Sequence, residues 1–555
     1  MANTLKELLL PCRGSFVIAL LVLVAYLPAL QGGYVWDDDS YVTANPTLTQ
    51  PDGLRRIWLE PGATPQYYPL VFSSFWAEHR LWQFRPAGYH IVNAVIHIIN
   101  ANLLWLLLAR IGFPLAWAAA AVFALHPLQV ESVAWITERK NVLSGCFYLL
   151  SAIIYLPLLA AVTNGDPDTR IRGRSRLTAW LAAFFLFVMA LLAKSVTATL
   201  PAVLLLLAWW QRGTVTRRDI GLLAPFFTVG AVAGLFTAWL EKNHVGVGGD
   251  LWSFSPDERF VIAGKNFWFY LAKTFWPHPL SFTYPRWQPH GYPWWHLTAP
   301  GAAIVLVLLL WRYRSRIGRG PLAAVLFLIV TLVPALGFVD FYPMRYSFVA
   351  DHFFYLAIIG PILFTLGIAA AGARLFQSCT APRNVWAGRL ATGVAPGILV
   401  LLLAALTWHR SGVYRDEETL WRDTLAKNPA ATSARVNLGV LLAKRGDYPE
   451  ALGLFQTALA EEPQSADILT NLGNVLASLR RPGDAESSYR AALRCDPGFV
   501  NAHLELGKLL AERGSLREAE DHFRRALDLD PASAAARFQL GKIMDVRDEG
   551  KQLAR

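Results

Sequence analysis

The stretch "FVIALLVLVAYLPALQGGYVWDDDSYVTANP", residues 16–46, places an apolar run of membrane-spanning length directly before three consecutive carboxylates, Asp37, Asp38 and Asp39. The run follows a short basic segment and lacks a small-residue cleavage site, which favours a retained membrane anchor over a signal peptide. The carboxylates therefore begin a loop at the membrane surface. Three adjacent acidic residues in such a loop make it a candidate functional site.

The rest of the composition agrees with a membrane protein. Of the 555 residues, 54% are hydrophobic and only 16% are charged, and the mean hydropathy is +0.34. Apolar runs predict about eleven transmembrane helices and hence an all-α polytopic domain. The runs lie at residues 15–31, 88–109, 114–125, 142–162, 178–193, 195–210, 221–240, 297–311, 321–339, 353–373 and 390–408.

Charge sets the expected orientation. The net charge is +11, but arginines concentrate in short loops between apolar runs, around residues 170–176, 212–218 and 312–319. The positive-inside rule places such loops in the cytoplasm, so the basic balance does not indicate a nucleic-acid partner. A cytoplasmic N-terminus is expected.

Alternation of sides from that N-terminus puts the loop 32–87, the segment 126–141 and everything after about residue 409 outside. In the same scheme the aromatic stretch 260–276 cannot span, and its lysines suit a helix lying in the membrane interface.

The polar C-terminal part repeats itself. Glycines recur every 34 residues at Gly439, Gly473, Gly507 and Gly541, and alanines, aromatics and prolines recur with them. This pattern predicts tetratricopeptide repeats, an α-solenoid whose concave groove suits extended peptides. The expected domains are residues 1–410 in the membrane, 411–545 as repeats and 546–555 as a tail. Within the repeats, 416–429 is expected to be the second helix of a degenerate leading repeat, and 532–545 a closing helix.

Several candidate site residues lie next to the apolar runs. The run 114–125 is too short to cross the bilayer, so His126 and Glu131 are expected below its outer surface, where ionisable groups mark function. The alternative is a loop whose polar groups meet water. Pro127 interrupts the helix here, and the cations Arg139 and Lys140 follow.

Two further groups are external in this scheme. Lys194 stands alone between two apolar runs and is either a snorkelling interface residue or an anion ligand. Arg345, Asp351 and His352 cluster just before a later run.

In an extended segment Asp37 and Asp39 would share one face and Asp38 would point to the other. Mutual repulsion raises the pKa of at least one carboxyl group, which suits a general base. A hydrated turn or a divalent-ion site are the alternatives. The four cysteines show no spacing typical of a disulfide framework or zinc site.

Six motifs resemble the transmembrane and tetratricopeptide-repeat O-mannosyltransferases and their bacterial relatives, which are GT-C-type glycosyltransferases. They are "YVWDDDSYVTANP" (34–46), "YYPL" (67–70), "GYHIVNAVIHIIN" (88–100), "HPLQVESVAWITERKNVLSG" (126–145), "LLAKS" (191–195) and "VADHFFYLAIIG" (349–360). The family often carries His where Gln129 stands and Gly-Arg-Ala-Asp where 138–141 read "ERKN". These departures keep acidic and basic elements and leave the donor sugar open.

The resemblance implies a polyprenyl-phosphate sugar donor, an external active site and an acidic residue in the first loop. Asp37 or Asp38 would take the proton from a Ser or Thr hydroxyl, and Asp37 leads because the family's acidic pair begins there. Asp39 has no counterpart in the family and is expected to be a bystander. A single displacement would invert the anomeric centre, with no cofactor or metal required.

The other candidates would bind the substrates. Fixed cations stabilise a departing phosphate, a role that suits Arg139, Lys140 and Lys194. His126 and Glu131 would position substrate or donor, and Arg345, Asp351 and His352 complete the expected binding set.

The expected function is thus transfer of mannose or another hexose to Ser or Thr of exported proteins held by the repeats. A glycolipid or cell-wall acceptor, or a non-enzymatic scaffold that recruits partners through the repeats, are the alternatives. A transporter is the weakest alternative, because no internal repeat of broken helices is visible. High Arg and Ala content favours a bacterial inner membrane, with the site and repeats in the periplasm.

Overall fold

The computed structural model describes residues 12–160, 173–245, 253–288, 291–379 and 395–553. These residues form helices joined by loops, and none of them lies in a β-strand. The chain divides into two compact units, Met1–Leu420 and Trp421–Arg555. The division falls inside helix α20 (Glu417–Lys427), a little later than the expected boundary at residue 410.

Each expected apolar run overlaps a helix of the first unit, and residues 161–162 and 390–394 of these runs lie outside the described residues. These helices are α2 (Cys12–Ala25), α7 (Pro86–Arg110), α8 (Ala116–Leu125), α10 (Arg139–Ala160), α11 (Gly173–Ala193), α12 (Leu200–Arg212), α13 (Arg217–Leu240), α15 (Thr298–Ile317), α16 (Gly320–Leu332), α17 (Ile359–Cys379) and α19 (Ala395–Ser411). Within the described ranges, 6 helical segments are long and apolar enough to cross a membrane, and α2, α8, α16 and α17 contain shorter apolar helices. The protein is therefore an integral membrane protein, but the predicted number of spans is not confirmed.

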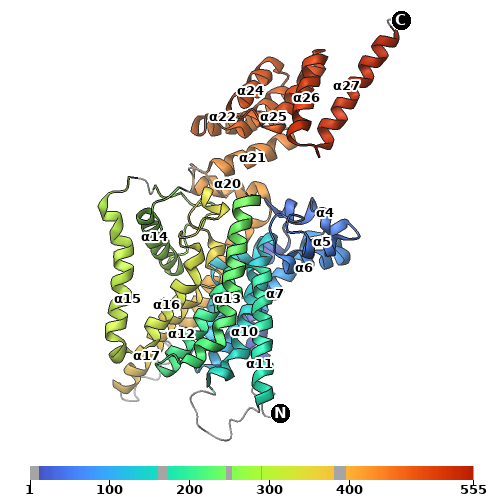
Figure 1. Ribbon diagram of the computed structural model, residues 1–555. Helices are drawn as coiled ribbons and strands as arrows, with labels where there is room; N and C mark the ends of the chain where they lie inside the picture. The colour runs from blue at the N-terminus through green and yellow to red at the C-terminus, as the bar shows by residue number, and fades with distance from the viewer. Residues whose placement is uncertain (1–11, 161–172, 246–252, 289–290, 380–394, 554–555) are drawn as a thin grey trace. The chain divides into compact units, whose positions relative to one another are not determined.

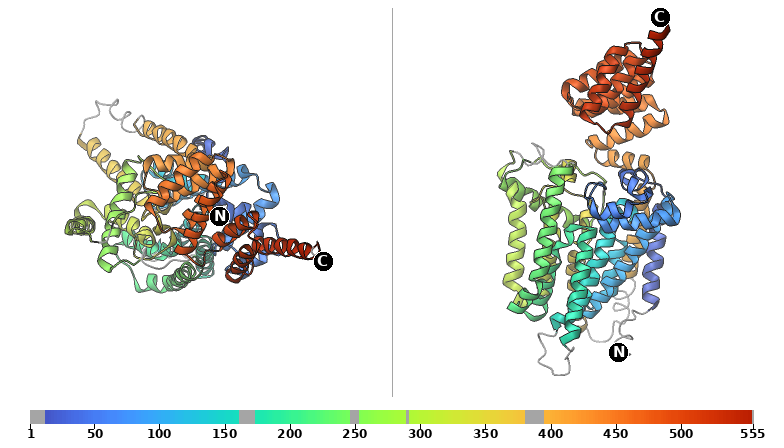
Figure 2. Two further views of the ribbon diagram at one scale, coloured as in Figure 1. Left: turned by 90° about the horizontal axis from the view of Figure 1, so that it is seen from above. Right: turned by 45° about the vertical axis from the view of Figure 1, so that its right-hand side comes forward.

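Long helices run side by side through this unit (Figures 1 and 2). Helix α10 packs along α7 and α11, and α13 contacts both α11 and α12. Aromatic and aliphatic side chains from α10 to α13 fill the space between them, including Tyr155, Phe187, Leu204 and Phe226. This packing provides the rigid frame on which the polar residues at one end are held.

The loop 32–87 is folded rather than extended. It contains the π-helical turn η1 (Asp39–Thr43) and the helices α4 (Pro46–Thr49), α5 (Gly53–Leu59) and α6 (Pro69–Trp82). Proline at the first helical position starts α4 and α6, where its missing N–H costs nothing. Tyr41, Ile57 and Phe72 of this loop share a core with Ile136 and Ala193. The loop is thereby packed against the segment that follows α8 and against the C-terminal end of α11.

The segment 126–141 is entirely inside the protein. It forms three short helices, η2 (Pro127–Gln129), α9 (Val130–Ala134) and η3 (Ile136–Glu138), before α10 begins. Every residue from Phe123 to Val142 is buried. Pro127 ends the continuous helix, as predicted, and the alternative of a water-exposed loop is wrong.

Helix α14 (Pro256–Phe275) covers the stretch expected in the membrane interface. Ser255 and Glu258 form a reciprocal capping box at its start, and Val261, Phe267 and Tyr270 are buried on one face. It is absent from the set of membrane-crossing segments found in the described chain, which agrees with the prediction that this stretch does not span; its place at the interface stays a prediction.

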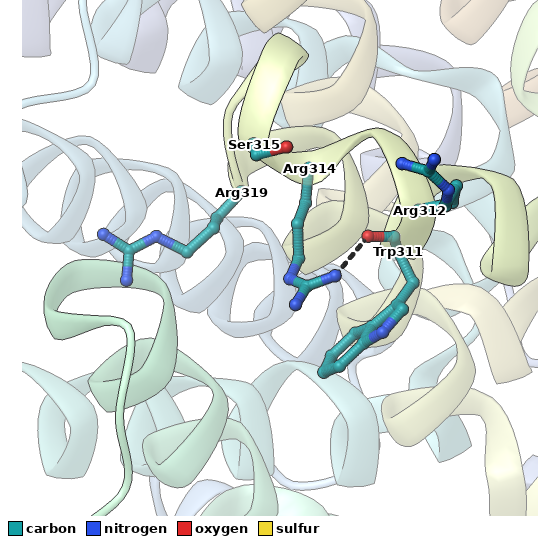
Figure 3. A pocket seen from close by; sticks show the side chains of 5 residues that line it. All are labelled: Trp311, Arg312, Arg314, Ser315 and Arg319. Atoms are coloured by element: carbon teal, nitrogen blue, oxygen red, sulfur yellow. Dashed lines mark hydrogen bonds between the residues drawn. The ribbon is translucent and has the colours of Figure 1, made fainter.

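Helix α15 lies at the edge of the unit (Figure 1). Only 6% of its apolar stretch is buried inside the protein. Its C-terminal end lies at the end of the unit opposite α4, α5 and α6. There, Trp311, Arg312, Arg314, Ser315 and Arg319 line a cavity (Figure 3).

The second unit is an α-solenoid of paired helices. They are α21 (Thr432–Arg445), α22 (Tyr448–Glu461), α23 (Ala466–Ser478), α24 (Pro482–Cys495), α25 (Val500–Glu512), α26 (Leu516–Leu529) and α27 (Ala534–Leu553). The leading helix predicted at 416–429 is α20. The closing helix α27 extends to Leu553, so most of the expected tail 546–555 is helical.

The recurring glycines have a steric cause. A Cβ at Gly507 would lie 2.7 Å from the ring of Phe523, and one at Gly439 would lie 2.9 Å from the ring of Phe455. Glycine is therefore required wherever the first helix of a repeat meets the aromatic ring of the second. Gly541 has no atom within 4 Å of its Cβ position, because no aromatic helix follows it in the described chain.

Candidate active site

The three aspartates lie in a turn rather than in the expected extended segment, although Asp38 differs in burial from Asp37 and Asp39 as the expected division of faces requires. Trp36 has φ 48°, a left-handed conformation that is uncommon for a bulky side chain, and η1 begins directly after Asp38. As a result Asp38 points inward and is fully buried, Asp37 is partly exposed, and Asp39 is exposed. The Asp39 carboxylate accepts a hydrogen bond from the Thr43 hydroxyl at 2.7 Å.

Asp38 ties the first loop to η3. Its Oδ2 accepts from the Val35 N–H at 2.9 Å, and its Oδ1 accepts from the N–H and the hydroxyl of Thr137 at 2.8 and 2.7 Å. Burial and the neighbouring Asp37 raise the pKa of Asp38 to about 8. The hydrogen bonds from Thr137 and Val35 act in the opposite direction and lower this pKa. Both carboxylate oxygens are occupied, so Asp38 is placed to hold the turn.

Asp37 is the carboxylate that is left available. Its Oδ1 has no hydrogen-bond partner among the described residues. Burial raises the pKa of Asp37 to about 6, Lys140 lowers it, and Glu138 raises it. Of the acidic pair, Asp37 thus loses its proton first and is the better candidate for a base at neutral pH.

The strained turn before Asp37 is fixed on two sides. The Trp36 ring stacks on Trp135, with centroids 5.5 Å apart, and the Trp36 backbone N–H donates to the Glu417 carboxylate at 3.0 Å. The Gly33 N–H donates to the Arg415 carbonyl at 2.7 Å. These contacts join the first loop to the segment 126–141 and to the end of the membrane unit. A strained residue held from several sides is typical of functional sites.

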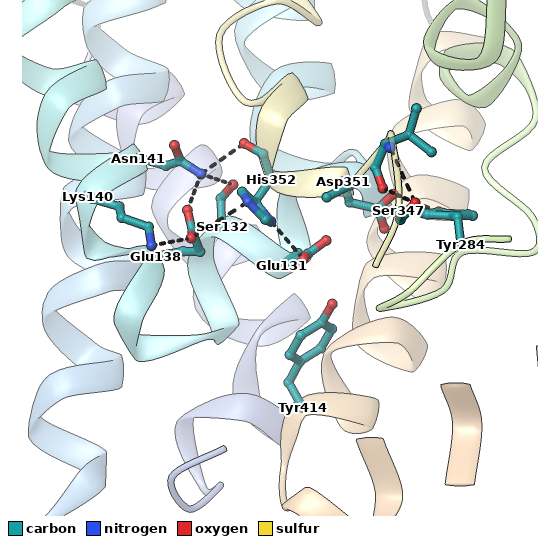
Figure 4. Close-up of polar contacts among 12 residues, drawn as sticks. Glu131, Ser132, Glu138, Lys140, Asn141, Tyr284, Ser347, Asp351, His352 and Tyr414 are labelled. Carbon is teal, nitrogen blue, oxygen red and sulfur yellow. Dashed lines mark hydrogen bonds and ion pairs between the residues drawn. The ribbon is translucent and has the colours of Figure 1, made fainter. Parts of the chain in front are cut away.

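Glu138 is the centre of a buried polar network (Figure 4). Its Oε1 lies 2.9 Å from the Lys140 ammonium, and its Oε2 lies 3.3 Å from the Lys194 ammonium. The Asn141 amide donates to Glu138 Oε2 at 2.6 Å, and its oxygen accepts from Lys194 at 2.7 Å. One carboxylate therefore holds two cations, Lys140 at the start of α10 and Lys194 directly after α11.

His352 extends this network to Glu131. Its Nδ1 lies 2.8 Å from Glu131 Oε1, and its Nε2 lies 3.8 Å from Glu138 Oε1. The Asn141 amide also donates to the His352 carbonyl at 2.9 Å. The structure thus brings together four residues that the sequence predicted as binding groups, namely Glu131, Lys140, Lys194 and His352.

Lys194 belongs to this network rather than snorkelling to water. Burial lowers the pKa of Lys194 to about 8, the Glu138 carboxylate raises it, and Lys140 lowers it. Both cations thus pair with the Glu138 carboxylate, and Asp37 near Lys140 and Glu131 near Lys194 add further negative charge. A cavity of about 50 Å³ lies beside them and is lined in part by Asn141, Lys194 and His352.

Asp351 and Arg345 lie outside that network. The Asp351 carboxylate accepts from the Tyr284 hydroxyl at 2.7 Å and lies 3.8 Å from Arg410 (Figure 4). Burial and Glu131 raise the pKa of Asp351 to about 7, and Arg410 lowers it. Arg345 is exposed, with its guanidinium 5.9 Å from the Tyr346 ring.

Arg139 is occupied inside the protein. It is fully buried and pairs with the Glu78 carboxylate through both terminal nitrogens. Its Nη2 also donates to the Tyr89 carbonyl at 2.9 Å, and its Nε donates to Asn93. The guanidinium therefore joins α6, α7 and α10, and we leave it out of the proposed phosphate site.

His126 is also bound within the protein. Its Nε2 lies 3.0 Å from the Thr274 carbonyl, and its Nδ1 accepts from the Leu128 N–H at 3.3 Å. Burial lowers the pKa of His126 to about 4, while the bond to Thr274 raises it. His126 is thus neutral at neutral pH, and it secures η2 to α14.

The sequence reasoning overlooked the residues that organise the site. Glu138 and Asn141 stand inside the quoted motif 126–145, and the available signal was an acid directly before two cations, Arg139 and Lys140, in that motif. Nothing in the sequence marked Thr137, Tyr284 or Glu78 as partners. Across the described residues, His, Cys, Asp and Glu side chains form no group of three or more that could hold a metal ion.

A comparison with protein families confirms the repeats. The family described as "Tetratricopeptide repeat" matches residues 414–466, 442–498, 470–534 and 504–543. Similar solved structures include YrrB, titled a TPR protein with an unusual peptide-binding site, at 22% identity, covering 30% of this chain and 84% of that one, with a TM-score of 0.21. Another is MamA, at 19% identity, covering 31% and 93%, with a TM-score of 0.20.

Curated relatives carry the name protein O-mannosyl-transferase. F38B6.6 of Caenorhabditis elegans is 27% identical over 158 residues, which cover 26% of this chain and 23% of the relative. Tmtc1 and Tmtc2 of Drosophila melanogaster are 33% and 35% identical over 147 and 160 residues, which cover 24% and 26% of this chain and 17% of each relative. Each alignment thus spans under a quarter of the relative's length. With its membrane unit and its tetratricopeptide repeats, the chain is a relative of the transmembrane and tetratricopeptide-repeat protein O-mannosyl-transferase family.

Proposed function

We propose that this protein is an inverting membrane glycosyltransferase that uses a polyprenyl-phosphate sugar and modifies Ser or Thr hydroxyls of proteins. The observation that carries the proposal is the Asp37 carboxylate, which is partly exposed, has an unpartnered oxygen and lies near a cluster of two lysines. The relatives named protein O-mannosyl-transferase support mannose or another hexose as the sugar.

In the proposed reaction the acceptor hydroxyl oxygen attacks the anomeric carbon of the donor. The bond from that carbon to the lipid phosphate breaks, and the Asp37 carboxylate takes the hydroxyl proton. A base with a pKa near the working pH is well matched to this step, and burial gives Asp37 a pKa of about 6. Asp38 positions Asp37 through its bonds to Val35 and Thr137 and does not contact the reacting atoms.

The leaving lipid phosphate is an anion and needs fixed cations. Lys140 and Lys194 are held by Glu138 before the substrate arrives, so they need no reorganisation during the reaction. The Lys140 ammonium also lies 5.3 Å from the Tyr41 ring, which restricts it further. Both lysines are therefore the proposed phosphate ligands, with His352 and Glu131 fixing the geometry from the other side of Glu138.

The arrangement of the chain in the cell belongs to the same proposal. A cytoplasmic N-terminus would place the aspartates outside a bacterial inner membrane, where lipid-linked sugars meet exported proteins. The tetratricopeptide repeats would capture the acceptor polypeptide, since such grooves commonly bind extended peptides.

The test is glycoproteomics of exported proteins from strains that lack the gene or express the wild-type chain, Asp37→Asn or Asp39→Asn at equal levels. The proposal expects a hexose mass on Ser or Thr with wild type and Asp39→Asn, and its absence with Asp37→Asn. A scaffold would restore every modification with all three chains. A change confined to glycolipid or cell-wall polymer would instead identify a non-protein acceptor.

A further inference from the structure

We propose that the cavity at the C-terminal end of α15 binds the phosphate headgroup of one anionic phospholipid. It is distinct from the candidate active site and lies at the opposite end of the membrane unit (Figures 1 and 3). The cavity has a volume of about 530 Å³ and is lined by Trp311, Arg312, Arg314, Ser315 and Arg319. Three guanidinium groups and one hydroxyl are a donor set suited to phosphate oxygens.

Two of the arginines are fixed before any ligand binds. The Arg314 Nη1 donates to the Trp311 carbonyl at 2.6 Å, and its guanidinium lies 4.0 Å from the centre of the Trp311 ring. The Arg319 Nη1 donates to the Trp209 carbonyl at 3.1 Å at the end of α12. Each guanidinium keeps other N–H groups for a ligand, because a guanidinium carries five donors.

Among the described residues, no acidic side chain compensates the positive charge at this cavity. In the part of the chain that the structure describes, no carboxylate forms an ion pair with Arg312, Arg314 or Arg319. Arg212, the last residue of α12, behaves differently, since it pairs with Asp219 at 2.6 Å. The positive-inside rule accounts for the presence of basic residues at such a helix end, but not for their fixed arrangement around one cavity.

The surroundings point to a lipid rather than a free anion. Helix α15 exposes Ile304, Val305, Leu308 and Leu309, which form the apolar surface that acyl chains require. The rings of Trp209 and Trp311 stack with centroids 6.0 Å apart, and tryptophans of this kind mark the membrane interface. A headgroup in the cavity would therefore have its acyl chains beside α15, and basic pockets between membrane helices bind anionic headgroups in this way.

The experiment is native mass spectrometry of the full chain in detergent, titrated with phosphatidylglycerol or phosphatidylcholine. The test variants are Arg312→Gln/Arg314→Gln and the triple variant that adds Arg319→Gln. The matched control is Arg110→Gln/Arg217→Gln/Arg218→Gln, which removes the same charge from exposed arginines outside the cavity. The double variant keeps the hydrogen bond from Arg319 to α12 and is therefore expected to fold. If the triple variant folds poorly, the double variant still tests the proposal.

We expect one phosphatidylglycerol to bind wild type and the control variant in preference to phosphatidylcholine. Affinity should fall about fivefold for each cavity arginine removed, because a basic residue near an anionic lipid contributes about 1 kcal/mol. Equal losses in the control and cavity variants would show diffuse attraction and overturn the proposal. Complete competition by inorganic phosphate would show a free-anion site and would also overturn it.

Discussion

Thr137 donates two hydrogen bonds to one oxygen of Asp38, from its N–H at 2.8 Å and from its hydroxyl at 2.7 Å. This contact joins the first loop to the buried segment before α10. It determines which way the acidic turn faces, because Asp38 can point inward only while these donors meet its carboxylate. The Asp37 carboxylate is left near Lys140.

We expect Thr137→Val to lower both stability and activity, because it removes one of the bonds to a buried carboxylate without changing side-chain size. The expected loss of stability is about 1 to 3 kcal/mol, measured as the unfolding midpoint in detergent. Thr43→Val is the matched control, since Thr43 donates at 2.7 Å to the exposed Asp39. Its effect should stay within about 0.5 kcal/mol, and equal effects of the two changes would contradict the account.

The rate of transfer should depend on the protonation of Asp37. Because burial raises the pKa of Asp37 to about 6, kcat/KM should fall about tenfold per pH unit below that value as the base becomes protonated. Glu138→Gln removes a charge that raises the pKa of Asp37 and should move the acidic limb to lower pH. Lys140→Gln removes a charge that lowers the pKa of Asp37 and should move the limb to higher pH. Limbs that shift in the same direction would exclude Asp37 as the titrating base.

Arg139 and Lys194 should fail in different ways when they are replaced. Arg139→Gln leaves the buried Glu78 without its partner, which should cost about 3 to 5 kcal/mol of stability. Lys194→Gln leaves Glu138 paired with Lys140, so its main effect should be on kcat and on KM for the donor. The measurements are unfolding midpoints together with donor kinetics on folded protein. If Arg139→Gln kept the wild-type unfolding midpoint and lost only donor binding, Arg139 would be a phosphate ligand after all.

The repeat glycines give a sharp contrast within one unit. Gly507→Ala should destabilise the solenoid, because the new Cβ would lie 2.7 Å from the Phe523 ring. Gly541→Ala should stabilise α27 by about 1 kcal/mol, since alanine is the better helix former and nothing lies within 4 Å. Hydrogen exchange of the full chain, followed over α25, α26 and α27, reports both changes. Similar protection of α25 and α26 in the two variants would contradict the steric explanation.

The sequence predicted the elements of the fold because their signals are local. Apolar runs, Pro127 and the 34-residue glycine period each act within a helix or between neighbouring helices, and each led to the right element. The number of membrane crossings could not be predicted from the sequence in the same way. Composition alone does not tell whether short apolar helices such as α8 and α16 cross the membrane.

The site was predicted only in part because its contacts are long-range. The turn at Trp36 replaces the expected extended segment, and it depends on Trp135 and Glu417, far away in the chain. Arg139 and Lys140 look alike as adjacent cations, yet one faces Glu78 and the other faces Glu138. Such differences arise from helix packing and leave no mark on a single sequence.

The most direct test of the central claim is sugar transfer by the purified full chain, with a synthetic polyprenyl-phosphate mannose and a Ser/Thr peptide in detergent. The account predicts that Asp37→Asn lowers kcat about a hundredfold or more, the usual contribution of a general base, while its unfolding midpoint stays that of wild type. Asp39→Asn, which removes the same charge two residues away, should transfer at the wild-type rate. Equal activity of Asp37→Asn and Asp39→Asn would contradict the account.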